Sequence, residues 1–179
     1  MTGRSHLLLT GAAYAALALH PIPTPLGPIS VPRLVPGGGL VPTLADAVAV
    51  ALVGLLPDVD QAGSKAARLG GWPTRALAWL VQVVLGHRGA LHSLAGALGA
   101  WWLGQVVGSA LGVPGLAGVA AFGWCAHLLL DAATAGGVPI LWPLPLRLRL
   151  PPGLSTGGLG EHAALLGLLA VCAWWTGLA

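Results

Sequence analysis

Residues of the kinds that bind metal ions recur along this chain, and the clearest pair is His127 and Asp131. They lie four residues apart in an apolar segment. If that segment is helical, the imidazole and the carboxylate lie one turn apart on the same face, which is a spacing typical of metal ligands. The two side chains could also hydrogen-bond to each other and satisfy a buried polar site. The pair alone does not decide between these interpretations.

Three further motifs carry side chains of the same kinds. Leu-Pro-Asp-Val-Asp contains Asp58 and ends at Asp60, and His-Arg-Gly-Ala-Leu-His-Ser begins at His87 and contains His92. His6 lies close to the start of the sequence. Imidazole and carboxylate donors without thiolates are the ligand set of zinc, manganese or iron, with zinc the most common. The predicted metal ligands are His6, Asp58, His87, His92, His127 and Asp131.

This ligand set is larger than one catalytic zinc ion requires, because such an ion uses about three protein ligands. We therefore expect two zinc ions, or three. A metal pair activates water and binds both the attacking and the leaving oxygen of a phosphoester. Arg88 could hold a phosphoryl oxygen, or it could equally anchor the chain at lipid headgroups. Asp60 or Glu161 would act as a base beside the metal or as an additional ligand.

The elements that must position these residues are strongly apolar. The chain has 179 residues, of which 56% are hydrophobic and 7% are charged. Because soluble domains carry roughly 25% charged residues, this composition indicates an integral membrane protein. The basic residues are scattered, which excludes a nucleic-acid-binding patch. Cys125 and Cys172 are isolated in apolar runs, so we interpret them as packing residues.

Apolar runs separated by Gly and Pro clusters predict one all-α domain over residues 1–179, a polytopic bundle that crosses the membrane about five times. The segments 91–112 and 115–135 are each long enough to span ~30 Å as helices. The run 73–86 is shorter and is expected to lie at the membrane interface or to re-enter. The other predicted spans are 7–19, 43–56 and 161–179.

The distribution of basic residues predicts the orientation of these spans. Five crossings place seven of the eight basic residues on one side and leave Arg33 on the other. Basic residues favour the cytoplasmic side, so we expect the N-terminus in the cytoplasm. The same topology brings every predicted ligand, with Asp60 and Glu161, to the cytoplasmic face. Asp46, His20 and His162 fall outside this group.

Two local patterns concern architecture. Gly104, Gly108 and Gly112 recur at every fourth residue, so they share a helix face and are predicted to allow a neighbouring helix to approach closely. Glycine is also frequent, with 28 copies, so chance spacing is the alternative explanation. The first apolar segment follows Arg4 and could be a cleaved secretory signal. Retention is favoured because this segment carries His6.

In four blocks the sequence resembles the YdjM-like family of bacterial inner-membrane proteins, regarded as metal-dependent hydrolases. The blocks are Thr-Gly-Arg-Ser-His ending at His6, the two motifs with Asp58 and His92, and the stretch from His127 to Pro143. Ala90 departs from the hydroxyl-bearing residue expected in the third block. More remotely, His127 and Asp131 resemble the His-x-x-x-Asp helix of zinc phospholipases C and single-strand nucleases. Their second element, His-x-x-x-Glu, has no counterpart here.

The resemblance implies a hydrolase in the bacterial inner membrane that acts on a phosphoester. Because the predicted site lies at headgroup depth, membrane lipids are the expected partners and a lipid phosphoester is the expected substrate. Two other functions stay open. A metal-ion transporter would need polar groups that continue across the membrane. A non-catalytic membrane adaptor would use zinc only to stabilise its structure.

Overall fold

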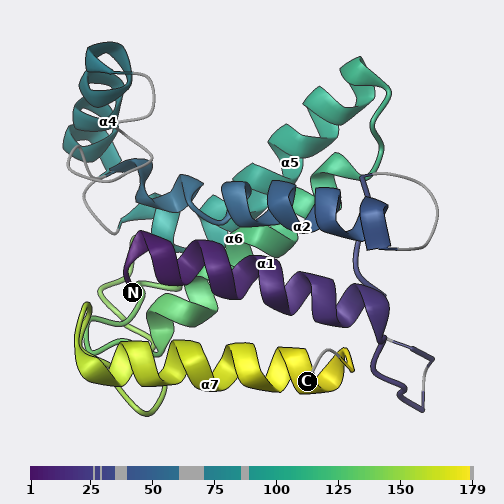
Figure 1. Cartoon of the computed structure of the whole chain (residues 1–179). Helices are drawn as coiled ribbons and strands as arrows, with labels where there is room; N and C mark the ends of the chain where they lie inside the picture. The colour runs from purple at the N-terminus through teal and green to yellow at the C-terminus, as the bar shows by residue number, and fades with distance from the viewer. Residues whose placement is uncertain (26, 29, 35–39, 61–70, 86–88, 178–179) are drawn as a thin grey trace.

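A computed structural model describes the chain except for residues 26, 29, 35–39, 61–70, 86–88 and 178–179 (Figure 1). The described residues form helices and no strand, and two isolated β-bridges, Thr134 with Leu154 and Val138 with Leu148, lie within the 133–158 connection. This agrees with the predicted all-α class. The helices are α1 (Gly3–Leu19), α2 (Leu40–Val53), the 3₁₀ helix η1 (Leu56–Asp60), α4 (Trp72–Leu85), the 3₁₀ helix η2 (Ala90–His92), α5 (Leu94–Leu111), α6 (Leu116–Ala132) and α7 (Leu159–Trp175).

The number of helices that could cross a membrane differs from the prediction. Within the described residues, two stretches are long and apolar enough to do so, Pro42–Asp60 and Leu94–Leu111. The prediction of about five is therefore corrected to two on this criterion. α6 and α7 have 17 residues each, which gives ~26 Å against a hydrocarbon core of ~30 Å. α6 ends earlier than predicted because the chain leaves the helix at Ala133.

Several helix ends lie together on one side of the bundle. α1 packs against α2 and α7, and α6 packs against both α2 and α5. Figure 1 shows the start of α1, the start of α7 and the end of α2 on the same side of the molecule. α4 contacts η1 and extends away from the bundle. This separate position suits a helix of 14 residues that was predicted not to cross.

The outer surface of α5 is apolar and exposed. Leu98, Trp102 and Leu111 are 66%, 62% and 68% exposed, respectively. A soluble monomer rarely presents an apolar surface of this extent to water. Such a surface is compatible with lipid. Hydrocarbon chains form no hydrogen bonds, so none are lost when they cover apolar side chains.

A buried carboxylate holds the far end of the bundle together. The Tyr14 hydroxyl lies 2.6 Å from the Pro32 carbonyl oxygen and 3.2 Å from Asp46 Oδ2. The backbone N–H of Leu34 donates to Asp46 Oδ1 at 3.2 Å. Asp46 therefore ties the connection between α1 and α2 to both helices, which is the structural role that the sequence left undecided.

Two of the three regularly spaced glycines allow α5 and α6 to approach closely. A Cβ atom on Gly104 would lie 2.7 Å from Ala117 Cα, and one on Gly108 would lie 3.3 Å from Leu116 Cβ at the start of α6 and 2.6 Å from the Val113 carbonyl oxygen in the turn before it. The predicted role is confirmed for these two residues and wrong for Gly112. Gly112 has φ +70° and caps α5, because this left-handed conformation favours glycine.

We expect Gly104→Ala to destabilise the protein by about 1–3 kcal/mol, because the added methyl group overlaps α6 backbone. The control is Gly99→Ala on the same helix, where an added Cβ would meet no described atom within 4 Å. Chemical unfolding in detergent micelles measures both free energies. Equal stability of the two variants would show that this close approach does not support the fold.

Candidate metal centre

Helix ends that lie far apart in the sequence meet at one end of the bundle. Asp58 lies in η1, directly after α2, and His92 ends η2, directly before α5. His127 and Asp131 lie one turn apart near the end of α6, and His6 lies near the start of α1. The convergence predicted from the sequence is therefore observed for these five residues. The side chains of all except Asp58 are almost completely buried.

Four donor atoms face one another in this cluster. The Nε2 atoms of His92 and His127 are 3.3 Å apart. His92 Nε2 lies 3.6 Å from Asp58 Oδ1 and 3.8 Å from Asp131 Oδ2, and His127 Nε2 lies 3.8 Å from each of these oxygens. Nitrogen and oxygen ligands of tetrahedral zinc are about 3.3–3.6 Å apart, given bond lengths of 2.0–2.2 Å. Asp58, His92 and His127, whose donor atoms all lie within 4.8 Å of one another, could thus hold a divalent cation, with Asp131 Oδ2 3.8 Å from both imidazole nitrogens.

The other ring nitrogen of each histidine determines what Nε2 presents to the cluster. His127 Nδ1 lies 2.7 Å from the Gly54 carbonyl oxygen. A carbonyl only accepts, so Nδ1 carries the proton and Nε2 presents a lone pair. His92 Nδ1 lies 3.2 Å from Asp60 Oδ2, and a carboxylate behind a histidine is a typical support of a metal ligand. When His92 is neutral, two imidazole lone pairs and two carboxylates converge, and they repel one another unless a cation or a proton lies between them.

The electrostatics around His92 favour positive charge. Burial by itself lowers the pKa of His92, but hydrogen bonds with Asp58 and Asp60 outweigh burial and raise that pKa to about 9. Without a metal ion, a proton is therefore retained between the imidazole and the two carboxylates. The surroundings that favour this proton favour a divalent cation in its place.

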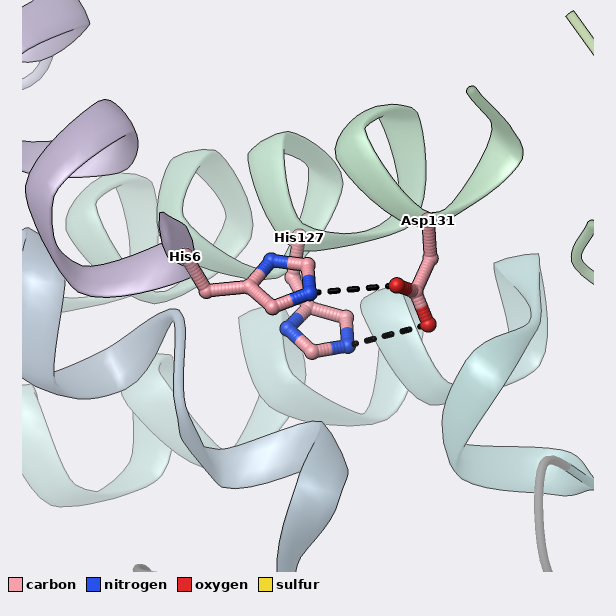
Figure 2. Close-up of side chains that lie close together, drawn as sticks. All are labelled: His6, His127 and Asp131. Carbon is pink, nitrogen blue, oxygen red and sulfur yellow. Dashed lines mark hydrogen bonds and ion pairs between the residues drawn. The ribbon is translucent and has the colours of Figure 1, made fainter. Parts of the chain in front are cut away.

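Asp131 also connects the cluster to α1 (Figure 2). Asp131 Oδ1 lies 3.1 Å from His6 Nε2 and contacts the amino group of Met1. The His6 and His127 rings are stacked, with centroids 3.9 Å apart. His6, His127 and Asp131 form a second group of possible ligands, whose donor atoms lie within 4.8 Å of one another. Because His127 has only Nε2 available, this group and the four-donor set share one nitrogen.

The two acidic residues predicted to act as a base have supporting contacts. Asp60 is buried beside His92 Nδ1, where it orients that ring. Glu161 accepts hydrogen bonds from the N–H groups of Thr2 at 2.7 Å and Gly157 at 2.8 Å, and from the Ser5 hydroxyl. Glu161 therefore fastens α7 to the first turn of α1, one layer away from the donor set.

The remaining candidates divide into two groups. His87 and Arg88 lie outside the described residues, so their roles stay predictions. His20 and His162 are exposed and lie apart from the cluster. The His162 ring hydrogen-bonds to the Gly158 carbonyl oxygen at 2.9 Å.

One residue that orients a histidine of the cluster could not be predicted from the sequence. Gly54 acts through its backbone carbonyl, which every residue type offers, so only the packing of α2 against α6 shows its function. Ser5 and Thr2, which hold Glu161, lie beside His6 in the first motif, and Thr2 caps α1. A Thr at a helix start is a recognisable capping signal, although it does not predict the contact with Glu161.

Comparison with known proteins agrees with the location expected for these helices. Residues 1–179 match the family described as YdjM inner membrane protein. The chain belongs to this family. It is 30% identical over 173 residues to the uncharacterized protein YvsG of Bacillus subtilis (strain 168), an alignment that covers 96% of this chain and 92% of YvsG. It is 35% identical over 100 residues to the inner membrane protein YdjM of Escherichia coli (strain K12), which covers 54% of this chain and 48% of that protein.

No solved structure matches this chain. Family membership supports a bacterial inner-membrane protein, and the YdjM resemblance drawn from the four sequence blocks is confirmed. The remote likeness to zinc phospholipases C and nucleases rests on the His127 and Asp131 motif alone.

We expect His92→Ala to lose most of the metal bound by the purified protein, because this change removes a donor and leaves three acceptors facing one another. The control is His162→Ala, which removes an exposed imidazole outside the cluster. Elemental analysis after dialysis against zinc measures metal content, and circular dichroism checks that both variants remain helical. Equal zinc content in the two variants would contradict the assignment.

We expect Asp60→Asn to weaken zinc binding by about 10–100-fold, because the amide still accepts from His92 Nδ1 but no longer makes the ring more basic. At saturating zinc the number of bound ions should equal that of the unmodified protein. Competition with a chromophoric chelator gives both quantities. An unchanged affinity would show that Asp60 does not support the metal ligand.

Proposed function

We propose that this inner-membrane protein is a metal-dependent hydrolase that cleaves a phosphoester of a membrane lipid. The observation that carries the proposal is the convergence of His92 Nε2 and His127 Nε2, 3.3 Å apart, each 3.6–3.8 Å from one carboxylate oxygen of Asp58 and one of Asp131. A site of this kind favours a divalent cation, because without one the repulsion among its buried acceptors is offset only by the proton on His92.

We expect zinc as the bound ion, with manganese or iron as chemically acceptable replacements. When bound, such an ion lowers the pKa of water and polarises a phosphoryl oxygen. His92, His127, Asp58 and Asp131 would hold it, while Asp60 and the Gly54 carbonyl fix the orientation of the two rings. The Asp58 side chain is 20% exposed, whereas the other three donors are at most 1% exposed. Water and substrate would therefore reach the cluster on the side of Asp58.

A second ion would depend on His6 and Asp131 Oδ1. His6 Nδ1 is buried and has no hydrogen-bond partner among the described residues. That second position has fewer protein donors than the first, since His127 Nε2 already belongs to the four-donor set. We therefore propose one tightly held ion, and we place the second of the predicted ions beside His6 with lower affinity.

A lipid substrate is proposed because of where the cluster lies. α2, α5, α6 and α7 are apolar, and the donors lie at helix ends, where a spanning helix meets the headgroups. We propose that α2 and α5 cross the membrane, with the cluster at the cytoplasmic face as the basic residues indicate.

One observation favours a second function. Four protein donors around one ion is the usual arrangement of a structural zinc site, which has no open position for water. A zinc-stabilised membrane adaptor is therefore the competing interpretation. A metal-ion transporter is less well supported, because Asp46, the buried acid at the other end of the bundle, is engaged by Tyr14 and Leu34.

The test is hydrolysis of a panel of phospholipids by the zinc-loaded protein in mixed micelles. We expect turnover that a chelator abolishes and added zinc restores. Asp58→Ala should lose at least 100-fold in kcat/KM, since it removes the accessible donor, and His162→Ala should retain full activity. The absence of turnover on every lipid by protein of confirmed zinc content would reject the hydrolase and favour the adaptor.

A further inference from the structure

An apolar groove runs along the outside of the bundle between η1, α5 and α6. Its volume is about 230 Å³, and its lining contains no polar side chain. It extends along α5 from Ala100 to Val107, which is about two helical turns or ~11 Å. The groove is therefore a slot parallel to the helices, smaller than the pockets of roughly 300–1,000 Å³ that enclose a compact ligand.

One end of this groove is built from residues that adjoin the metal donors. Leu56 lies two residues before Asp58 in the same 3₁₀ helix, and Trp124 lies three residues before His127 in α6. The Trp124 indole N–H donates to the Leu91 carbonyl oxygen at 2.8 Å, which fixes that wall beside His92. The groove thus begins about one helical turn from the cluster and runs away from it.

The exposed donor of the cluster belongs to η1, the 3₁₀ helix that also lines the groove. Asp58 is the exposed member of the four-donor set, and it shares η1 with Leu56. The groove also opens outward along α5, where Leu103 is 56% exposed and Val107 is 37% exposed. A linear apolar molecule could therefore enter from the bilayer and extend along α5 with one end near Asp58.

We propose, on the basis of the proposed function, that this groove binds an acyl chain of the lipid substrate and directs the phosphoester toward η1 and the cluster. The lining offers no hydrogen-bond partner for a headgroup, which assigns the groove to the hydrocarbon part of the lipid. The surrounding inner membrane supplies that hydrocarbon. The substrate class is then a long-chain lipid phosphoester, and water-soluble phosphoesters are poor substrates.

The test compares adjacent residues on α5. Val107→Trp fills the groove, while Val106→Trp places the same side chain on lipid-facing surface outside it, where Val106 is 49% exposed. Both variants are placed in nanodiscs of phosphatidylethanolamine and phosphatidylglycerol, with a trace of phosphatidylglycerol whose acyl chain carries a diazirine. After photolysis, mass spectrometry compares labelling of the groove at Leu56 and Leu103 with labelling of Leu98 elsewhere on α5.

We expect Val107→Trp to reduce groove labelling at least fivefold relative to Val106→Trp, with zinc content unchanged in both. Leu103→Trp, at the open edge of the groove, should reduce the labelling of Leu56 similarly. Equal groove labelling in Val107→Trp and Val106→Trp would overturn the proposal.

Activity separates this proposal from the proposed function. With Val107→Trp, we expect kcat/KM for a long-chain phospholipid to fall at least tenfold, while the slow hydrolysis of bis-p-nitrophenyl phosphate stays unchanged. If the unmodified protein labels in the groove but hydrolyses no lipid, the acyl site stands and the hydrolase fails. If Val107→Trp hydrolyses long-chain lipid as fast as Val106→Trp, the acyl site fails and the hydrolase stands.

Discussion

The arrangement of this protein depends on the mutual repulsion of acceptors that are buried together. His92, His127, Asp58 and Asp131 direct lone pairs or negative charge at a common space, and burial removes the water that would screen them. Only positive charge makes this packing favourable, and His92 shows this through a raised affinity for its proton. The helices around the cluster are otherwise joined by apolar contacts, by close glycine packing and by the hydrogen bonds of Asp46 and Glu161.

Much of the centre could be predicted because the chain contains few polar residues. In a sequence with 7% charged residues, each ionisable group within an apolar helix needs a partner, so short motifs such as Leu-Pro-Asp-Val-Asp stand out. The distribution of basic residues predicted the relative direction of the helices, and that predicted direction brought Asp58, His92 and His127 to one end. The spacing of His127 and Asp131 then fixed their common face.

Other features could not be read from residue types. Glu161 lies at the predicted end of the bundle, but its oxygens accept hydrogen bonds from Thr2, Ser5 and Gly157. No pattern in the sequence predicts which nearby donor a carboxylate will accept from. Gly104 and Gly112 have the same spacing but different functions, because the helix ends between Leu111 and Gly112. The number of crossings was overestimated because apolar runs continue past the residues where the backbone leaves the helix.

The origin of the donors in separate segments has a consequence for biogenesis. Asp58 and His92 emerge from the ribosome early, whereas His127 and Asp131 emerge only when α6 is made, so the four-donor site cannot be complete on a nascent chain that stops before α6. Before α6 is made, Asp58 and His92 can contact each other and Asp60 but not His127 or Asp131, so the proposed ion would be acquired after the larger part of the polypeptide has entered the bilayer. Loading with the proposed ion would thus be a late step that follows insertion, and the availability of metal at the membrane surface would govern how much newly made protein completes the site.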